Sequence, residues 1–147
     1  MTAQKTILLI EDNPDDIELT RLAFAEARIA NSLTVFHDGI EALDWLFARG
    51  RYAGRDRHEL PALVLLDLNL PKLDGRDVVR AIRADAATRA VPVVALTSSV
   101  ERPDVDACYA LGVNSYLQKP VEFAEFVSAV RQLGMYWLVL NQPAAEL

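Results

Sequence analysis

The chain has 147 residues, of which 52% are hydrophobic, and this length and composition suit one globular domain with a continuous apolar core. Its 15 basic and 21 acidic residues give a formal net charge of −6, which disfavours binding to a nucleic-acid backbone. The single cysteine excludes an internal disulfide. Residues 1–5 lack the apolar region of a secretory signal, and no apolar run reaches the roughly 18 residues of a membrane span, so we expect a cytoplasmic protein without membrane contact.

Five segments predict β-strands, and helix-like segments alternate with them along the chain. The predicted strands are residues 6–10, 33–36, 62–66, 91–96 and 113–117. This alternation predicts an α/β fold with a parallel sheet and right-handed crossovers. The first, third and fourth segments are almost wholly apolar, which is typical of central strands covered on both faces. Between the second helix and the third strand, residues 49–60 have no periodicity and predict a long solvated loop.

Three of the predicted helices follow a residue whose side-chain oxygen can accept a hydrogen bond from a free main-chain amide. These residues are Asn13, Asp38 and Asp74. Acidic residues in a first helical turn also complement the helix dipole. We therefore assign capping or first-turn roles to five aspartates and exclude them from any functional site: Asp15, Asp16, Asp38, Asp74 and Asp77.

Polar residues stand at the ends of four predicted strands. Glu11 and Asp12 follow the first strand, Asp67 the third, Thr97 the fourth and Lys119 the fifth. Ligands of parallel α/β sheets bind beyond the carboxyl ends of the strands, so we expect one shared site. Carboxylates gathered there repel one another unless a divalent cation offsets their charge. Mg²⁺ is the expected ion because it prefers hard oxygen ligands, with Asp12 and Asp67 as direct ligands and Glu11 acting through water.

A carboxylate held beside Mg²⁺ can attack phosphorus and form an acyl phosphate. Asp67 is the expected nucleophile, while Lys119 supplies a cation and Thr97 a hydroxyl for the phosphoryl oxygens. Neither G-x-G-x-x-G nor G-x-x-x-x-G-K-[ST] occurs in the chain, which disfavours a nucleotide-binding protein.

Four motifs, in this order, resemble the receiver domain of two-component response regulators: I-E-D-N-P-D-D, L-L-D-L-N-L-P-K-L-D-G, A-L-T-S-S and Y-L-Q-K-P. The resemblance covers residues 5 to about 130. It implies a flavodoxin-like (βα)5 doubly wound parallel sheet with strand order 2-1-3-4-5. It also implies a signalling phosphoacceptor, which catalyses its own phosphotransfer and slow autodephosphorylation, in place of an enzyme acting on an external substrate.

The resemblance assigns a role to each matching residue. Asp67 resembles the phosphoacceptor, Glu11 and Asp12 the acidic pair that binds Mg²⁺ or Mn²⁺, and Asn69 the residue whose main-chain carbonyl binds metal. The remaining matches are Thr97 and Lys119 as the switch hydroxyl and lysine, Tyr116 as the aromatic that turns inward, and Lys119–Pro120 as a cis peptide bond.

Within this family, N-P-D-D, D-L-N-L-P-K, residues 49–60 and the aromatic C-terminal segment look like phytochrome-associated single-domain regulators. This narrower resemblance implies that the partner is a sensor histidine kinase of the phytochrome type. We expect one receiver domain over residues 1–147 and no output domain.

Residues 122–142 predict an extended C-terminal helix. One apolar stripe docks this helix on its own sheet, and it consists of Phe123, Phe126, Val127, Val130, Trp137 and Leu138. Other apolar residues lie off the stripe and predict a twofold homodimer. The expected interface contains Met135, Tyr136, Trp137, Val139 and Leu140. The alternative is a tail that folds back over its own sheet.

Two other functions fit part of the pattern. An aspartate-nucleophile phosphatase of the haloacid dehalogenase type needs an acid two residues after the nucleophile, where this chain has Asn69. A phosphorylation-independent, receiver-like scaffold has no need of Glu11, Asp12, Asp67, Thr97 and Lys119 together.

Overall fold

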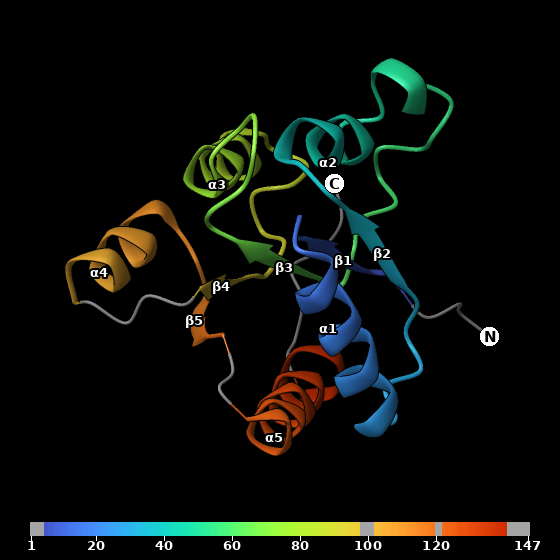
Figure 1. Ribbon diagram of the computed structural model, residues 1–147. Helices are drawn as coiled ribbons and strands as arrows, with labels where there is room; N and C mark the ends of the chain where they lie inside the picture. Colours follow the sequence, from blue (N-terminus) through green and yellow to red (C-terminus); the bar gives the residue numbers. More distant parts are fainter. Residues whose placement is uncertain (1–4, 98–101, 120–121, 141–147) are drawn as a thin grey trace.

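The computed structural model describes residues 5–97, 102–119 and 122–140. Within these ranges, five parallel strands form one sheet in the order β2-β1-β3-β4-β5 (Figure 1). The strands are β1 (Ile7–Ile10), β2 (Leu33–Phe36), β3 (Leu63–Asp67), β4 (Val93–Thr97) and β5 (Ser115–Gln118). The predicted α/β class and flavodoxin-like strand order are confirmed.

In the part of the chain that the structure describes, five α-helices cover the two faces of the sheet. They are α1 (Pro14–Glu26), α2 (Gly39–Leu46), α3 (Gly75–Ala84), α4 (Arg102–Leu111) and α5 (Phe123–Leu133). In Figure 1, α1 and α5 lie on one face, and α2, α3 and α4 lie on the other. No helix in the described ranges is both long and apolar enough to cross a lipid bilayer.

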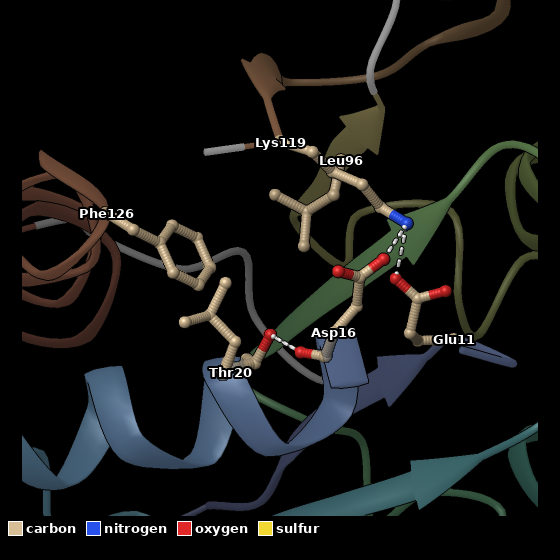
Figure 2. A pocket seen from close by; sticks show the side chains of 7 residues that line it. Glu11, Asp16, Thr20, Leu96, Lys119 and Phe126 are labelled. Atoms are coloured by element: carbon tan, nitrogen blue, oxygen red, sulfur yellow. Dashed lines mark hydrogen bonds and ion pairs between the residues drawn. The ribbon is translucent and has the colours of Figure 1, made fainter. Parts of the chain in front are cut away.

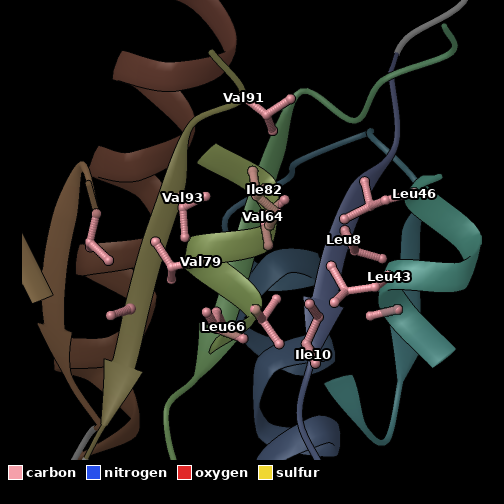
Figure 3. Packing of buried hydrophobic residues seen from close by; sticks show 14 of the residues in the cluster. Leu8, Ile10, Leu43, Leu46, Val64, Leu66, Val79, Ile82, Val91 and Val93 are labelled. Atoms are coloured by element: carbon pink, nitrogen blue, oxygen red, sulfur yellow. The ribbon is translucent and has the colours of Figure 1, made fainter. Parts of the chain in front are cut away.

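Each face of the sheet has its own apolar core because successive strand residues point to opposite sides. On the α2 and α3 side (Figure 3), the cluster includes Leu8, Ile10, Leu43, Leu46, Val64, Leu66, Val79 and Ile82. On the α1 and α5 side, it includes Ile7, Leu9, Phe24, Leu63, Leu65, Phe126 and Val130. Burial on both faces explains why the central strands are apolar up to Asp67 and Thr97, the polar residues that end β3 and β4.

The predicted helix caps are confirmed. Asn13 accepts hydrogen bonds from the main-chain amides of Asp15 at 2.9 Å and Asp16 at 3.2 Å. Asp38 accepts one from the amide of Glu41 at 2.8 Å, and Asp74 caps α3 in the same way. These bonds fix where α1, α2 and α3 begin relative to the strand ends.

Three strands, β3, β4 and β5, end one residue later than the sequence predicts, and polar residues end β3 and β4. Asp67 is the last residue of β3 and pairs in register with Leu96, and Thr97 is the last residue of β4 and pairs with Gln118. A polar residue can keep its place in the main-chain ladder even where the apolar run has stopped. The two side chains are therefore carried by the sheet itself and not by the loops that follow it.

The prediction of a solvated loop over residues 49–60 is only partly correct. The segment begins with a short 3-10 helix (Gly50–Tyr52), and the Tyr52 hydroxyl donates a hydrogen bond to Glu41 at 2.7 Å. The Arg55 guanidinium lies over the Trp45 ring, 3.6 Å from its centroid. Arginine stacking on aromatic rings anchors a loop without any apolar periodicity, so the sequence pattern did not reveal it.

The C-terminal helix predicted over residues 122–142 changes from one helical type to another part-way along. The α-helix ends at Leu133, and the chain continues as a π-helical segment, η2 (Gly134–Leu140). A Cβ at Gly134 would lie 2.8 Å from Ile29 Cδ1, so glycine permits this close approach to the end of α1. The last two residues of the predicted range, 141–142, lie outside the described part of the chain.

The docking stripe of this helix is largely as predicted. Its central members are buried: Phe126, Val127 and Val130. Trp137 and Leu138 pack partly against the same core, whereas Phe123 is 41% exposed, contrary to the prediction. Trp137, which is also in the predicted dimer interface, thus contacts its own domain. The side chains of Val139 and Leu140 lie outside what the structure describes.

Candidate functional site

The carboxyl ends of the strands bring three predicted acidic residues together. Glu11 and Asp12 follow β1, and Asp67 ends the neighbouring strand β3. Their carboxylate oxygens all lie within 4.8 Å of one another. Glu11 and Asp67 are buried and Asp12 is exposed, so the cluster opens to solvent on the Asp12 side.

Lys119 reaches this cluster from the end of β5. Its ammonium nitrogen is 2.7 Å from Glu11 Oε1 and 3.1 Å from Asp67 Oδ2. A third carboxylate, Asp16 Oδ2, is also 2.7 Å away (Figure 2 shows the Glu11 and Asp16 contacts). The lysine therefore has three acidic partners, and two of them belong to the predicted site.

The exclusion of Asp16 from the site was wrong. Asp16 does lie in the first turn of α1, as predicted, but its side chain also contacts Lys119. One residue can lie in the first turn of α1 and also belong to the site, because the amino end of α1 faces the carboxyl ends of the strands. The signal in the sequence was the Asn13–Pro14 pair, which fixes the helix start and so places Asp16 one turn after Asp12.

Main-chain amides hold the two buried carboxylates. Asp67 Oδ1 accepts a hydrogen bond from the amide of Asn69 at 3.0 Å, and Glu11 Oε2 accepts one from the amide of Asp12 at 3.1 Å. At Gly75, a Cβ would lie 2.7 Å from both the Asp67 carbonyl oxygen and Leu68 Cα. The start of α3 therefore packs directly against the chain that carries Asp67.

Burial and crowding change the proton affinities in the site. Burial, together with a hydrogen bond to Asp67, raises the pKa of Glu11 from 4.5 to about 7, and Lys119 opposes this shift. Burial alone would lower the pKa of Lys119, but hydrogen bonds to Asp16, Glu11 and Asp67 outweigh it and raise that pKa. The site thus combines one permanent cation with a larger number of acid groups. A divalent cation would offset the repulsion among these carboxylates.

The other predicted site residues lie around this centre. Thr97 is buried at the end of β4, and its carbonyl accepts a hydrogen bond from the Lys119 amide at 2.6 Å. Asn69 is exposed, and Tyr116 is half-buried against the core on the α2 and α3 side. Pro120 lies outside the described residues, as does the predicted cis bond. The switching roles of Thr97 and Tyr116 remain predictions.

Residues 7–131 match the family described as the response regulator receiver domain. The chain belongs to this family. The match spans every strand of the sheet and all the site residues named above.

Individual relatives are similar over almost their whole length. The response regulator Rcp1 of Synechocystis sp. is 38% identical over 142 residues, which are 96% of this chain and 95% of Rcp1. The solved Mn²⁺-bound form of Rcp1 has a TM-score of 0.83, at 37% identity over 96% of this chain and 99% of that one.

Two other solved relatives are described as phytochrome regulators. The phosphorylated cyanobacterial phytochrome response regulator RcpA has a TM-score of 0.87, with 36% identity over 97% of this chain and all of RcpA, 100%. The bacteriophytochrome response regulator AtBRR is 46% identical over 96% of this chain and 100% of its own, with a TM-score of 0.77. This receiver domain is thus related to phytochrome response regulators, and its acidic cluster fits a Mg²⁺ site.

Proposed function

We propose that this receiver domain accepts a phosphoryl group from a sensor histidine kinase onto Asp67, with Mg²⁺ or Mn²⁺ as the metal. The observation that carries the proposal is the convergence of the Asp67 carboxylate, the acidic cluster and the Lys119 ammonium. Two relatives support the same chemistry, since RcpA has been solved in a phosphorylated form and Rcp1 in a Mn²⁺-bound form.

The donor set fits a hard divalent cation. Glu11, Asp12 and Asp67 offer carboxylate oxygens within 4.8 Å of one another, and the Asn69 main-chain carbonyl is the proposed further ligand. When bound, the ion offsets the negative charge of these carboxylates and of the phosphoryl oxygens. The acid groups outnumber the one lysine that contacts them, which supports this need for positive charge.

The residues of the chain carry the transfer itself. A carboxylate oxygen of Asp67 attacks the phosphorus of the donor phosphohistidine, so that an O–P bond forms as the P–N bond breaks. The electron pair of the broken bond stays on the imidazole nitrogen. Lys119 and the Thr97 hydroxyl meet the charge on the transferring oxygens. The product adds nearly two negative charges to the site and draws these two residues inward, which shifts the population of surface conformations, with Tyr116 turning inward.

Removing the acceptor carboxylate tests this proposal. Wild-type protein incubated with acetyl phosphate and Mg²⁺ is expected to acquire an acid-stable phosphoryl label, whereas Asp67→Asn acquires none. Asp77→Asn, which removes an exposed carboxylate on α3, serves as the matched control and labels like wild type. Acid-stable label on Asp67→Asn would refute the assignment of the acceptor, and unlabelled wild-type protein would favour the scaffold function.

The phosphatase alternative has less support. Asn69 stands where a haloacid dehalogenase-type enzyme needs a proton donor, and its amide side chain has no transferable proton. The Asn69 main chain instead donates to Asp67. A steady-state assay on a phosphate ester distinguishes the phosphoacceptor from the phosphatase, because many fast turnovers would favour the phosphatase.

We also propose a phytochrome-type kinase as the phosphoryl donor. The similarity to the phytochrome response regulators RcpA and AtBRR supports this choice, since these cover 97% and 96% of the chain. Phosphotransfer from a purified kinase of this type should be at least tenfold faster than from an unrelated histidine kinase, as specificity is a difference in affinity of that order. Equal rates from both kinases would contradict the proposal.

The C-terminal segment is the proposed surface of a homodimer. Met135 and Tyr136 are 54% and 51% exposed on η2, although both are large and apolar. Size-exclusion chromatography with light scattering should give a dimer for wild type and a monomer for Met135→Glu with Tyr136→Ser. Tyr109→Ser, a change at an equally exposed tyrosine on α4, is the matched control and should remain dimeric. A wild-type monomer at micromolar concentration would contradict the proposal.

A further inference from the structure

Asp16 is fixed on a rigid helical turn beside Lys119. Its main-chain amide donates to the Asn13 cap at 3.2 Å, and its carbonyl accepts a hydrogen bond from the Thr20 hydroxyl at 2.7 Å. Figure 2 shows its carboxylate approaching the ammonium group from the α1 side, while Glu11 approaches from β1. The Asp16 side chain is 31% exposed, so solvent only partly screens its contact with Lys119.

The three carboxylates around Lys119 use all of its donors. An ammonium group has three N–H bonds, and Glu11, Asp16 and Asp67 accept one each. Glu11 and Asp67 also belong to the acidic cluster that fits a metal, whereas Asp16 does not. A phosphoryl oxygen on Asp67 therefore gains a bond to Lys119 only if one of the existing bonds is released.

The surroundings strengthen the Asp16 contact. A small pocket lies beside it, and besides Glu11, Asp16, Thr20 and Lys119 its lining is apolar: Leu19, Leu96 and Phe126. Apolar walls lower the local dielectric constant and so strengthen the attraction between the two charges. The contact is thus stronger than a pair of the same length on an open surface.

From this geometry we infer that Asp16 is a positioning residue that acts as a latch on Lys119, holding its ammonium toward α1 in competition with the phosphoryl group on Asp67. The inference rests on the proposed function. It adds that the readiness of this receiver to take and keep a phosphoryl group depends on an acid outside the acidic cluster. Removing the Asp16 charge frees the ammonium for the phosphoryl oxygens and lessens the repulsion of an anionic donor.

The first measurement is the rate of labelling by acetyl phosphate with Mg²⁺. Asp16→Asn should label about fivefold faster than wild type and lose its label about fivefold more slowly, the size expected for a partly exposed ion pair. Asp15→Asn removes the same charge from the same helical turn, but at a side chain that is not among the three that hold Lys119. This matched control should behave like wild type.

The second measurement follows the lysine itself in metal-free protein. The chain has three lysines, Lys5, Lys72 and Lys119, so mass spectrometry can compare their modification by an amine-acylating reagent within one sample. Asp16→Asn should raise the modification of Lys119 about threefold or more relative to the other two. A change that merely loosened the helix start would leave this ratio as it is in wild type.

The outcomes are distinct. Faster labelling of Asp16→Asn that disappears in a Lys119→Met background supports the latch, because the effect then passes through the lysine. Either of two results for Asp16→Asn overturns the latch: Lys119 acylation as in wild type, or phosphoryl labelling no faster than in wild type. Both count against the latch even if the proposed function holds, that is, if wild type is labelled and Asp67→Asn is not. An unlabelled wild type overturns the proposed function and, with it, the competition for Lys119.

Discussion

Two half-buried cations lie at opposite ends of the sheet, and they differ in the charge of their partners. Lys119 follows β5 at the carboxyl end and is held by three carboxylates. Arg83, on α3, reaches the amino end, where β4 and β5 begin. Its partners are all neutral oxygens: Gly112 O at 2.9 Å, Arg89 O at 2.8 Å, Val91 O at 2.7 Å and Asn114 Oδ1 at 2.8 Å.

This difference separates a structural contact from a functional one. The planar guanidinium of Arg83 matches fixed carbonyl and amide oxygens, and Asn114 Oδ1 also accepts a bond from the Val93 amide at 2.8 Å. These oxygens are part of the folded chain and carry no charge, so the contacts of Arg83 involve no exchange of anions. The partners of Lys119 are carboxylates, so an anionic phosphoryl group can compete with them for the ammonium, and a metal ion can compete with the ammonium for them. We expect the amino end to determine stability and the carboxyl end to determine phosphotransfer.

The largest expected effect is a slower phosphotransfer when the charge of Lys119 is removed. Lys119→Met should slow labelling by acetyl phosphate by about 100-fold or more, because it removes a donor aimed at the developing charge. Lys119→Arg should recover little of the rate, since a guanidinium differs from an ammonium in shape. Lys72→Met is the matched control at an exposed lysine and should label normally. A labelling rate of Lys119→Met within threefold of wild type would contradict the claim that Lys119 determines phosphotransfer.

The next effect is on stability, at the other end of the sheet. Arg83→Ala loses four hydrogen bonds, of which those to the Gly112 and Val91 carbonyls are part-buried, so the free energy of unfolding should fall by about 3 kcal/mol. Arg80→Ala, on the same helix but 59% exposed, should cost less than about 0.5 kcal/mol. Chemical denaturation measures both, and the folded Arg83→Ala protein should still label at nearly the wild-type rate. Similar losses for the two variants would contradict the structural role of Arg83.

Stability should depend on pH through the carboxyl end. The pKa of Glu11 is about 7 in the folded protein and 4.5 as its ordinary value, so the folded state holds an extra proton between these pH values. The free energy of unfolding of metal-free protein should therefore fall by about 2 to 3 kcal/mol as pH rises from 4.5 to 7. Glu11→Gln should flatten this slope, and Mg²⁺ should offset the loss at pH 7. A slope as steep in Glu11→Gln as in wild type would assign the effect to other groups.

The smallest expected effect tests how closely α3 packs against the site. Gly75→Ala places a Cβ 2.7 Å from the Asp67 carbonyl oxygen, so main-chain atoms must shift. The cost should be about 1 to 2 kcal/mol in unfolding free energy, together with slower labelling because Asp67 moves. Gly54→Ala is the matched control, as a Cβ there has nothing within 4 Å. If Gly75→Ala equals this control in both measurements, the packing argument fails.

The sequence predicted the carboxyl end of the sheet better than the amino end. Apolar runs that stop at Asp67 and before Lys119 mark strand ends directly, and parallel pairing brings such ends together. The contacts of Arg83 were not predictable, because its acceptors are main-chain carbonyls and one amide that only the folded chain brings near. The contact between Asp16 and Lys119 was not predicted for a different reason. A carboxylate in a first helical turn complements the helix dipole, but this role does not prevent it from also contacting a lysine.

Other departures have local causes. The π-helical segment begins at Gly134, where a Cβ would lie 2.8 Å from Ile29 Cδ1, and no apolar periodicity encodes this close approach. Arg55 on Trp45 shows that a loop can be anchored by ring contacts in a segment whose composition predicts only solvent exposure. In both places tertiary contacts, and not local sequence preference, determine the conformation.

The central claim is that Asp67 itself becomes the acyl phosphate. Borohydride reduction of protein labelled with acetyl phosphate and Mg²⁺ converts a phosphorylated aspartate to homoserine, and peptide mass spectrometry then locates it. We predict homoserine at position 67 and aspartate at positions 12 and 16. Homoserine at another position, or none in labelled protein, would contradict the account.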